Sequence, residues 1–243
     1  MSRSNPHVNS PNPSARWFEW NGEHGTIRYY DRDTKKNADV PLPFAFLLLD
    51  ELASVRGWHE SSKSGIYSNE VRDTRTDVLV VKSFKGGTLA EGIYKDIKDR
   101  VCSRAIGGQF VANCYIAFKN GTGLTIGSLR FKGAALGAWM EFRKQHRGDL
   151  YNKAVKVTGY TEGVKGRIVF RVPTFTLQDV AEESHHIAVT LDEELQAWLT
   201  AYFSRRTSDQ TESAADDTQA EPEQNDETGY GGDVPLTEDD IPF

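Results

Sequence analysis

Short stretches in which apolar and polar residues alternate, separated by turns that contain glycine, make up most of residues 16–175. The expected strands are residues 16–20, 26–31, 44–50, 53–58, 65–71, 78–84, 110–119, 124–131, 153–160 and 167–175. Several connections are short, such as KNGTG at residues 119–123 and TEGVKG at residues 161–166. Closely spaced short strands of this kind indicate an antiparallel barrel or sandwich.

Three helices are predicted to interrupt the strands. Residues 88–105 repeat an apolar residue every four positions, and Thr88 with Glu91 has the spacing of a capping box. Residues 132–148 form a second candidate that ends at Gly148. A third candidate, residues 190–206, begins with a capping box of Thr190 and Glu193. The expected fold class is therefore mainly β with about three added helices packed on the strands.

The charge of the chain is divided between its body and its C-terminal segment. Residues 207–243 contain twelve Asp and Glu and no Lys or Arg. Because the whole chain has a formal net charge of −6, residues 1–206 carry +6. A basic body beside an acidic segment suggests that the body meets a polyanion.

Both ends of the chain lack the apolar residues that a core needs. Residues 1–15 are rich in Asn, Ser and Pro, and residues 207–243 are rich in Asp, Glu, Gln, Thr and Gly. Neither segment buries enough apolar area to offset its chain entropy. We therefore expect a disordered N-terminal arm at residues 1–15, one folded domain at residues 16–206 and a disordered acidic tail at residues 207–243.

No recognisable catalytic or metal-binding constellation is found in the sequence. Cys102 and Cys114 lie twelve positions apart with no Cys-x-x-Cys motif, and His185 and His186 are expected in a loop. We therefore predict a non-enzymatic protein with no catalytic residues, no metal and no cofactor. The longest apolar run, residues 44–49, is too short to span a bilayer, and the low cysteine content suits a cytosolic protein.

Basic residues are interleaved with aromatic residues on several of the expected strands. Alternation places Ile168, Phe170 and Val172 inward and their neighbours outward. The residues predicted to face outward and to contact nucleic acid are Arg28, Tyr30, Tyr115, Lys119, Lys156, Tyr160, Lys165, Arg167 and Arg171. Aromatic rings stack on any base while Lys and Arg follow the phosphates, so the pattern favours single-stranded nucleic acid. Taken alone, it also fits ordinary residues of a strand surface.

An apolar tip ends the acidic segment, and its residues are Asp239, Asp240, Ile241, Pro242 and Phe243. This DDIPF ending resembles the C-terminus of bacterial single-stranded-DNA-binding proteins, whose terminal Phe and carboxylate dock into pockets of replication and repair enzymes. The resemblance implies that the five residues bind such partners here. In its layout, the longer body looks like the single-stranded-DNA-binding proteins of tailed bacteriophages. That likeness implies an elaborated oligonucleotide-binding (OB) barrel ahead of the acidic tail.

These features together predict a sequence-independent single-stranded-DNA-binding protein that acts in DNA replication, recombination and repair. It would work in the cytoplasm of the bacterial host if it is phage-encoded. Two alternatives stay open: an adaptor that docks on replication proteins through the tip without binding DNA, and a recombination protein that anneals complementary strands. A further hypothesis is that the acidic tail competes with DNA for the basic body and that DNA binding releases the tip.

Overall fold

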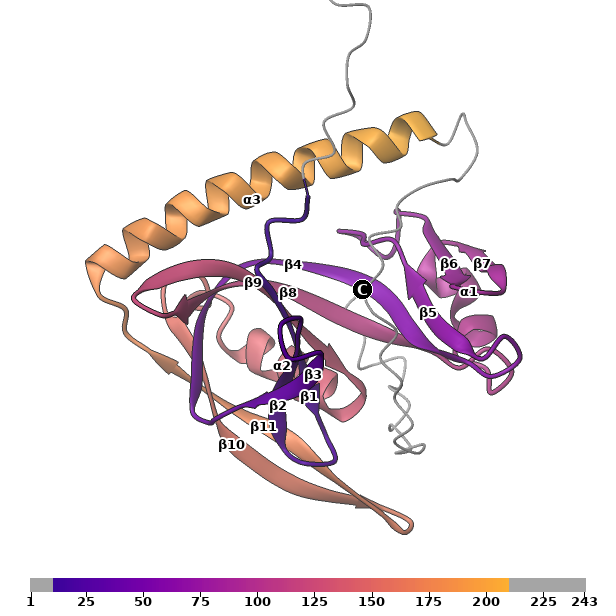
Figure 1. The fold of residues 1–243 in the computed structure, drawn as a ribbon, viewed down its shortest axis with the longest axis horizontal. Helices are drawn as coiled ribbons and strands as arrows, with labels where there is room; N and C mark the ends of the chain where they lie inside the picture. The colour runs from indigo at the N-terminus through magenta and orange to yellow at the C-terminus, as the bar shows by residue number, and fades with distance from the viewer. Residues whose placement is uncertain (1–10, 210–243) are drawn as a thin grey trace, which may run out of the picture.

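The computed structural model describes residues 11–209, with side chains described up to Ser204. This part of the chain forms eleven strands and three helices (Figure 1). The strands are β1 (Arg16–Asn21), β2 (Thr26–Asp31), β3 (Lys36–Val40), β4 (Phe44–His59), β5 (Ser64–Ser68), β6 (Leu79–Ser83), β7 (Gly87–Gly92), β8 (Gly108–Asn120), β9 (Gly123–Lys132), β10 (Ala154–Lys165) and β11 (Ile168–Gln178). The helices are α1 (Tyr94–Val101), α2 (Gly133–Gln145) and α3 (Glu182–Asp209).

One long strand, β4, organises the sheet. The strand order is β3-β2-β1-β9-β8-β4-β5-β6-β7, and β10 pairs with both β4 and β11. The 16 residues of β4 pair with β10 at their beginning, with β5 at their end and with β8 along most of their length. Strand β4 therefore connects a larger β-rich body to a smaller lobe of β5, β6, β7 and α1, which lies to the right in Figure 1.

The larger body has an aromatic core between the sheet and helix α2. Phe18 of β1 and Phe118 of β8 meet edge to face with ring centroids 4.8 Å apart. Helix α2 contributes Trp139, whose ring stacks on Phe131 of β9 at 5.3 Å, and all four rings are almost completely buried. Aromatic side chains bury large apolar areas, so this cluster contributes strongly to the stability of the body.

A partly buried carboxylate connects α2 to β4. Glu51 of β4 accepts a 2.7 Å hydrogen bond from the indole nitrogen of Trp139 and forms an ion pair with Arg143. Burial, together with the Glu51 charge across the strand pair, raises the pKa of Cys114 on β8. The Cys114 thiol therefore stays protonated and packs as a small apolar group.

Strand β11 approaches the turn between β1 and β2 at Arg171. The backbone N–H of Arg171 donates to the carbonyl of Gly22 at 2.7 Å, and its carbonyl accepts from the indole nitrogen of Trp20 at 2.9 Å. Strand β11 therefore lies against the turn between β1 and β2, although no strand ladder joins them and the sheet stays open there.

The smaller lobe has an aliphatic core of its own under helix α1. Val55 at the end of β4 meets Ile66 of β5 and Val81 of β6, and α1 covers them with Ile97 and Val101. Phe110 of β8 packs against both this cluster and the aromatic core of the larger body. Both cores consequently lie on the same side of β4 and β8.

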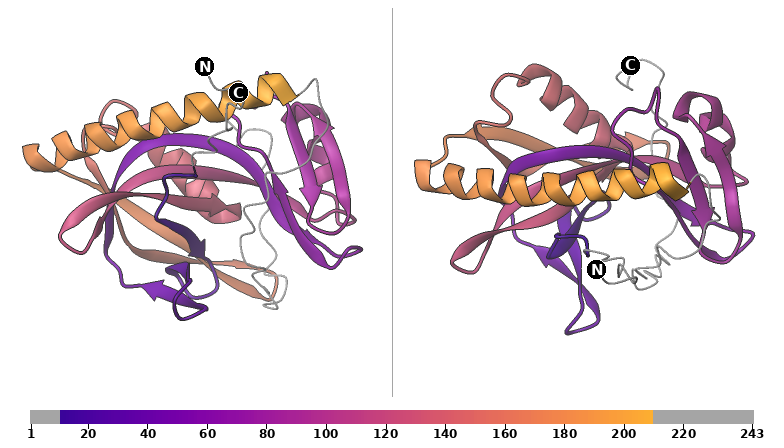
Figure 2. Two further views of the ribbon diagram at one scale, coloured as in Figure 1. Left: turned by 45° about the horizontal axis from the view of Figure 1, so that its top comes forward. Right: turned by 90° about the horizontal axis from the view of Figure 1, so that it is seen from above.

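Helix α3 lies across the opposite side of β4, β8 and β9, as Figures 1 and 2 show. Leu195 and Leu199 of α3 are completely buried against Leu47, Leu52 and Tyr115 of the sheet. Residues 12–15 run beside the same contact, where the backbone N–H of residue 15 donates to the carbonyl of residue 126 at 2.8 Å. Both faces of β4 are thus covered at residues 46–49.

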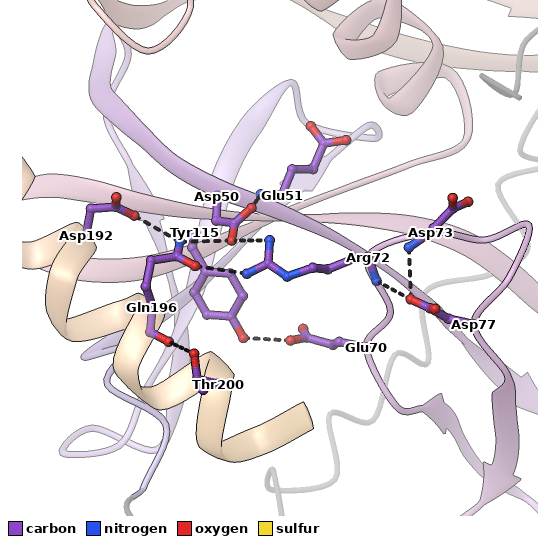
Figure 3. Close-up of polar contacts among 10 residues, drawn as sticks. All are labelled: Asp50, Glu51, Glu70, Arg72, Asp73, Asp77, Tyr115, Asp192, Gln196 and Thr200. Atoms are coloured by element: carbon purple, nitrogen blue, oxygen red, sulfur yellow. Dashed lines mark hydrogen bonds and ion pairs between the residues drawn. The ribbon is translucent and has the colours of Figure 1, made fainter. Parts of the chain in front are cut away.

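A polar network holds α3 to the sheet and to the connection between β5 and β6 (Figure 3). Arg72 forms a 2.9 Å ion pair with Asp50 and donates a 2.9 Å hydrogen bond to Gln196 of α3. Gln196 in turn donates to Asp50 at 3.1 Å, and the Tyr202 hydroxyl accepts from the backbone N–H of Glu70 at 3.0 Å. Directional contacts therefore fix the position of α3 in addition to apolar burial.

The predicted mainly β class with three helices is confirmed, but the first helix was wrongly bounded. Residues 87–92 form strand β7, so the capping box of Thr88 and Glu91 is wrong and α1 begins at Tyr94. Thr88 instead pairs with Lys82 of β6. The pairing of two strands therefore prevails over the local helical pattern.

Two further boundaries differ from the sequence prediction. The expected strands at residues 44–50 and 53–58 form the single strand β4, with an irregular register between Leu48 and Asp50. Helix α3 begins at Glu182, eight residues before the predicted capping box, so His185 and His186 lie in the helix and not in a loop. Apolar contacts of Ala188 with the sheet accompany this extra length.

Replacing Leu199 by alanine should lower the free energy of unfolding by about 2–5 kcal/mol, because the change removes buried methyl groups and leaves a cavity. Urea denaturation followed by circular dichroism measures this. The matched control is Val189→Ala on the same helix, where the side chain is 46% exposed and a change within about 0.5 kcal/mol is expected. Equal effects of the two substitutions would contradict the position of α3.

Candidate nucleic-acid interface

A row of polar and charged side chains crosses four neighbouring strands on the side of the sheet opposite the aromatic core. Across β2, β1, β9 and β8, the row consists of Arg28, Glu19, Arg130 and Asn113, each directly opposite the next. The residues adjacent to them in sequence point into the core, as Phe18 does. Because successive residues of a strand face opposite sides, this row points away from the core.

Two further rows lie on the same side of the sheet, toward the smaller lobe. The first consists of Lys132 and the buried residues Val111 and Ser54, and the second of Gln109, Arg56, Tyr67 and Lys82. Together the three rows bring five cations to one side of the sheet, and we call them the basic face: Arg28, Arg56, Lys82, Arg130 and Lys132. Glu19 lies among these cations, and Asp39 lies opposite Arg28 at the β3 edge.

The carboxylate of Glu19 is balanced by three cations of the basic face. Lys132 forms a 2.8 Å ion pair with it. Burial raises the pKa of Glu19, but attraction and a hydrogen bond from Lys132, with attraction to Arg130 and Arg28, outweigh burial and hold the pKa below its usual value. Glu19 is therefore ionised at neutral pH, and the four side chains together carry +2.

The residues predicted from sequence to contact nucleic acid are spread over several surfaces. Arg28 and Tyr30 lie on the basic side of β2. Lys119 lies at the end of β8, beside the turn to β9. Four more members belong to the β10–β11 hairpin and its turn, namely the half-buried Lys156 and the exposed Tyr160, Lys165 and Arg167. The structure thus does not bring the predicted set together on one face.

Tyr115 is buried, which corrects the expectation that its ring is exposed. Its side chain lies under α3 with its ring centroid 6.2 Å from that of Trp198, and only 1% of the residue is exposed. Burial, followed by the nearby Glu70 carboxylate, raises the pKa of Tyr115 well above its usual value. The hydroxyl stays protonated and donates to Glu70 at 2.6 Å (Figure 3). Alternation placed Tyr115 on the correct side of β8, but it could not show that a helix covers that side.

Arg171 is held in contacts on the core side of β11, not on the predicted outward row. It forms a 3.2 Å ion pair with Glu162, lies over the ring of Tyr160 at 5.3 Å and donates to the carbonyl of Glu23. Two and four residues further along β11, Pro173 is buried and Phe175 packs on the aromatic core. Arg171 therefore serves mainly to dock the hairpin against the β1–β2 turn.

The expectation that Ile168, Phe170 and Val172 face inward is also wrong, because the row of β11 that contains Arg171 is the one on the core side. They alternate with the row of β11 that reaches the core, so they lie on the opposite side of the hairpin. An alternating pattern separates two rows of side chains, but it does not say which row meets the core when both contain apolar residues.

The end of the β10–β11 hairpin forms a second, smaller basic surface. The hairpin extends beyond the larger body (Figure 1), and Lys165 and Arg167 at its turn are exposed. Val164 and Val169, which pair across the hairpin, are 69% and 49% exposed. This end carries fewer cations than the basic face and lies outside its three rows.

Sequence reasoning missed four of the five cations of the basic face. Arg130 and Lys132 alternate with buried Leu129 and Phe131, so the alternation argument would have found them had it been applied to β9. Arg56 and Lys82 join the surface only through the pairing of β4 with β5 and of β5 with β6. No local sequence signal specifies that pairing.

The predicted partner-binding tip, Asp239, Asp240, Ile241, Pro242 and Phe243, lies outside the described residues. Within residues 11–209, no group of three or more His, Cys, Asp and Glu side chains is arranged to hold a metal ion. Over the same residues, none of the helices has the length and apolar character needed to cross a membrane. Comparisons with protein-family models, with curated proteins and with solved structures found no match.

The charge balance at Glu19 predicts how stability depends on pH. Because the folded pKa lies below the usual value of 4.5, ionised Glu19 stabilises the fold above that value, and the stabilisation disappears as the pH falls through the folded pKa. Glu19→Gln should therefore be less stable than the parent at pH 7 and lose less stability between pH 7 and pH ~3. Urea denaturation at each pH measures this, with the exposed Glu23→Gln as control. Parallel pH profiles for Glu19→Gln and the parent would refute it.

Proposed function

We propose that this protein binds single-stranded DNA without sequence preference and that the strand lies across the basic face. The observation that supports this most is the gathering of five cations on one side of the sheet by strand pairing. Phosphates are the same in every sequence, so a surface that reads charge alone gives affinity without sequence readout. The net charge of +6 on residues 1–206 agrees with such a role.

The dimensions of the basic face suit a short length of single strand. Its cations lie on strands between β2 and β6, which are seven neighbours in the sheet order. With strands about 4.8 Å apart, the face extends roughly 29 Å. A stacked strand has one phosphate per 3.4 Å or so, which gives about eight phosphates along this path and fewer if the strand is extended. Site sizes of about 4–16 nucleotides are usual for single-strand-binding folds of the OB type.

The larger body is in this proposal an elaborated OB-type barrel. Its support is the curved set of strands around one aromatic core and the approach of β11 to the β1–β2 turn through Arg171. The C-terminal tip, with Phe243 as anchor, would recruit replication, recombination or repair proteins, on the strength of the DDIPF ending. Binding along the face would protect single strands in those processes.

The proposal predicts that charge removal on the basic face weakens DNA binding. In titrations of a fluorescent oligo-dT at several salt concentrations, the double variant Arg56→Gln/Arg130→Gln should bind more weakly. Its slope of log K against log salt should be smaller by about 0.7 for each phosphate that the variant no longer neutralises. The control Lys144→Gln/Arg147→Gln removes the same charge from the exposed end of α2 and its following turn, and should bind like the parent.

A third variant, Lys165→Gln/Arg167→Gln, decides between the two basic surfaces. A weakening confined to this variant would move the binding surface to the hairpin. Absence of oligo-dT binding by the unmodified protein would refute the proposal and leave the adaptor alternative. Acceleration of duplex formation between complementary strands would favour the annealing alternative.

Competition by the acidic segment is tested by ending the chain after Asp209, where α3 ends, because a cut at Arg206 would remove residues of the helix. The shortened protein should bind oligo-dT more tightly, with the largest gain at low salt, because charge competition is screened by ions. A full-length control with the Asp and Glu of residues 210–243 changed to Asn and Gln should gain as much. Unchanged affinity and salt dependence in both would refute the competition.

A further inference from the structure

The stacked rings of Tyr67 and Phe84 lie at the lobe end of the basic face, and we propose that they form a platform on which an unpaired nucleobase stacks. This inference rests on the proposed function, since the base would belong to the strand that follows the cations. The platform would contact the base, whereas the cations of the basic face would contact the phosphates.

The two rings are oriented as a platform requires. Their centroids are 4.7 Å apart and their planes differ by only 28°. Phe84 is 42% exposed, and neither ring belongs to a core cluster of the described residues. A large apolar ring left exposed in this way gains by stacking on a flat partner.

Gly65 is the local reason that the Phe84 ring occupies this position. The backbone N–H of Phe84 donates to the carbonyl of Gly65 at 3.1 Å, so the two residues lie side by side on β5 and at the end of β6. A Cβ atom at position 65 would meet ring atoms of Phe84 at 3.1 and 3.3 Å. The bare glycine thus lets the ring lie close over the strand backbone.

The residues around the platform favour a base that belongs to an anionic strand over a ligand without charge. Tyr67 lies directly between Arg56 and Lys82 across the paired strands. Trp58 lies opposite Gly65 on the same side of the sheet and adds a third aromatic residue. Cations on two sides of the stacked rings complement a ligand that carries flat rings on an anionic chain, which is the chemistry of a single strand.

The lobe has its core on the other side of β5 and β6, so the rings of Tyr67 and Phe84 are not required for it to fold. Ile66 and Val81, the neighbours of Tyr67 and Lys82 in sequence, point into the aliphatic core of the lobe. The row that carries the two rings therefore faces away from that core. Truncating Phe84 should leave the lobe folded, which a thermal melt of the variant checks.

The experiment compares two fluorescent oligomers of equal length, oligo-dT and an abasic oligomer that keeps the sugar–phosphate chain and lacks bases. The full-length protein should bind oligo-dT at least several-fold more tightly. Phe84→Ala should weaken oligo-dT binding by about 5- to 150-fold, the range for removal of one base stack, and leave abasic binding unchanged. Phe84→Trp, which keeps a flat ring, should retain the preference for oligo-dT.

The outcomes separate this inference from the proposed function. If the protein binds both oligomers with a strong salt dependence and Phe84→Ala weakens neither, or weakens both equally, the platform is refuted and the basic face stands. If the unmodified protein binds neither oligomer, the proposed function itself fails. If Phe84→Ala instead changes the oligomeric state in analytical ultracentrifugation without altering oligo-dT binding, the rings contact a second copy of the chain, which also refutes the platform.

Discussion

Burial of β4 on both faces at residues 46–49 is the constraint on which the other elements depend. One side of this strand meets two cores, first the aromatic one and then the aliphatic one of the smaller lobe. On the other side, Leu47, Leu49 and Leu52 need a cover, and α3 supplies it. A strand with two buried faces has a continuous apolar run and not an alternating one, as residues 44–49 show. The irregular register after Leu48 brings Asp50 to the edge of the α3 contact, where Arg72 pairs with it.

The helices and strands that pack against a single core could be predicted from the sequence. The strands at residues 16–20 and 26–31 and helix α2 follow from periodicity because each has a single buried face. Residues 87–92 and the start of α3 could not be placed, because strand pairing with β6 and docking on β4 decide them. These contacts join residues far apart in the sequence, and periodicity within a single segment carries no information about them.

The candidate site likewise depends partly on charge that can be read from the sequence and partly on contacts between distant segments. Net charge and its position along the chain were sufficient to predict a basic body. The location of that charge depends on strand register, since Arg28 and Arg130 meet only through Glu19 on the strand between them. Arg171 shows the converse: a cation in a favourable pattern is held by Glu162 and a backbone carbonyl, so its charge mainly positions the hairpin.

In the chain, helix α3 lies between the sheet that carries the basic face and the acidic segment that follows it in the sequence. The helix covers one end of the outer side of the sheet, including Tyr115, so the surface offered to a ligand lies beyond it. Its C-terminal part reaches the connection after β5, where Tyr202 meets Glu70 and the guanidinium of Arg72 lies 5.5 Å over the ring of Phe203. The acidic sequence therefore begins on the side of the molecule where Tyr67 and Lys82 end the basic face. The proposed competition between the acidic segment and DNA would be favoured by this proximity, which the docking of α3 on the sheet provides.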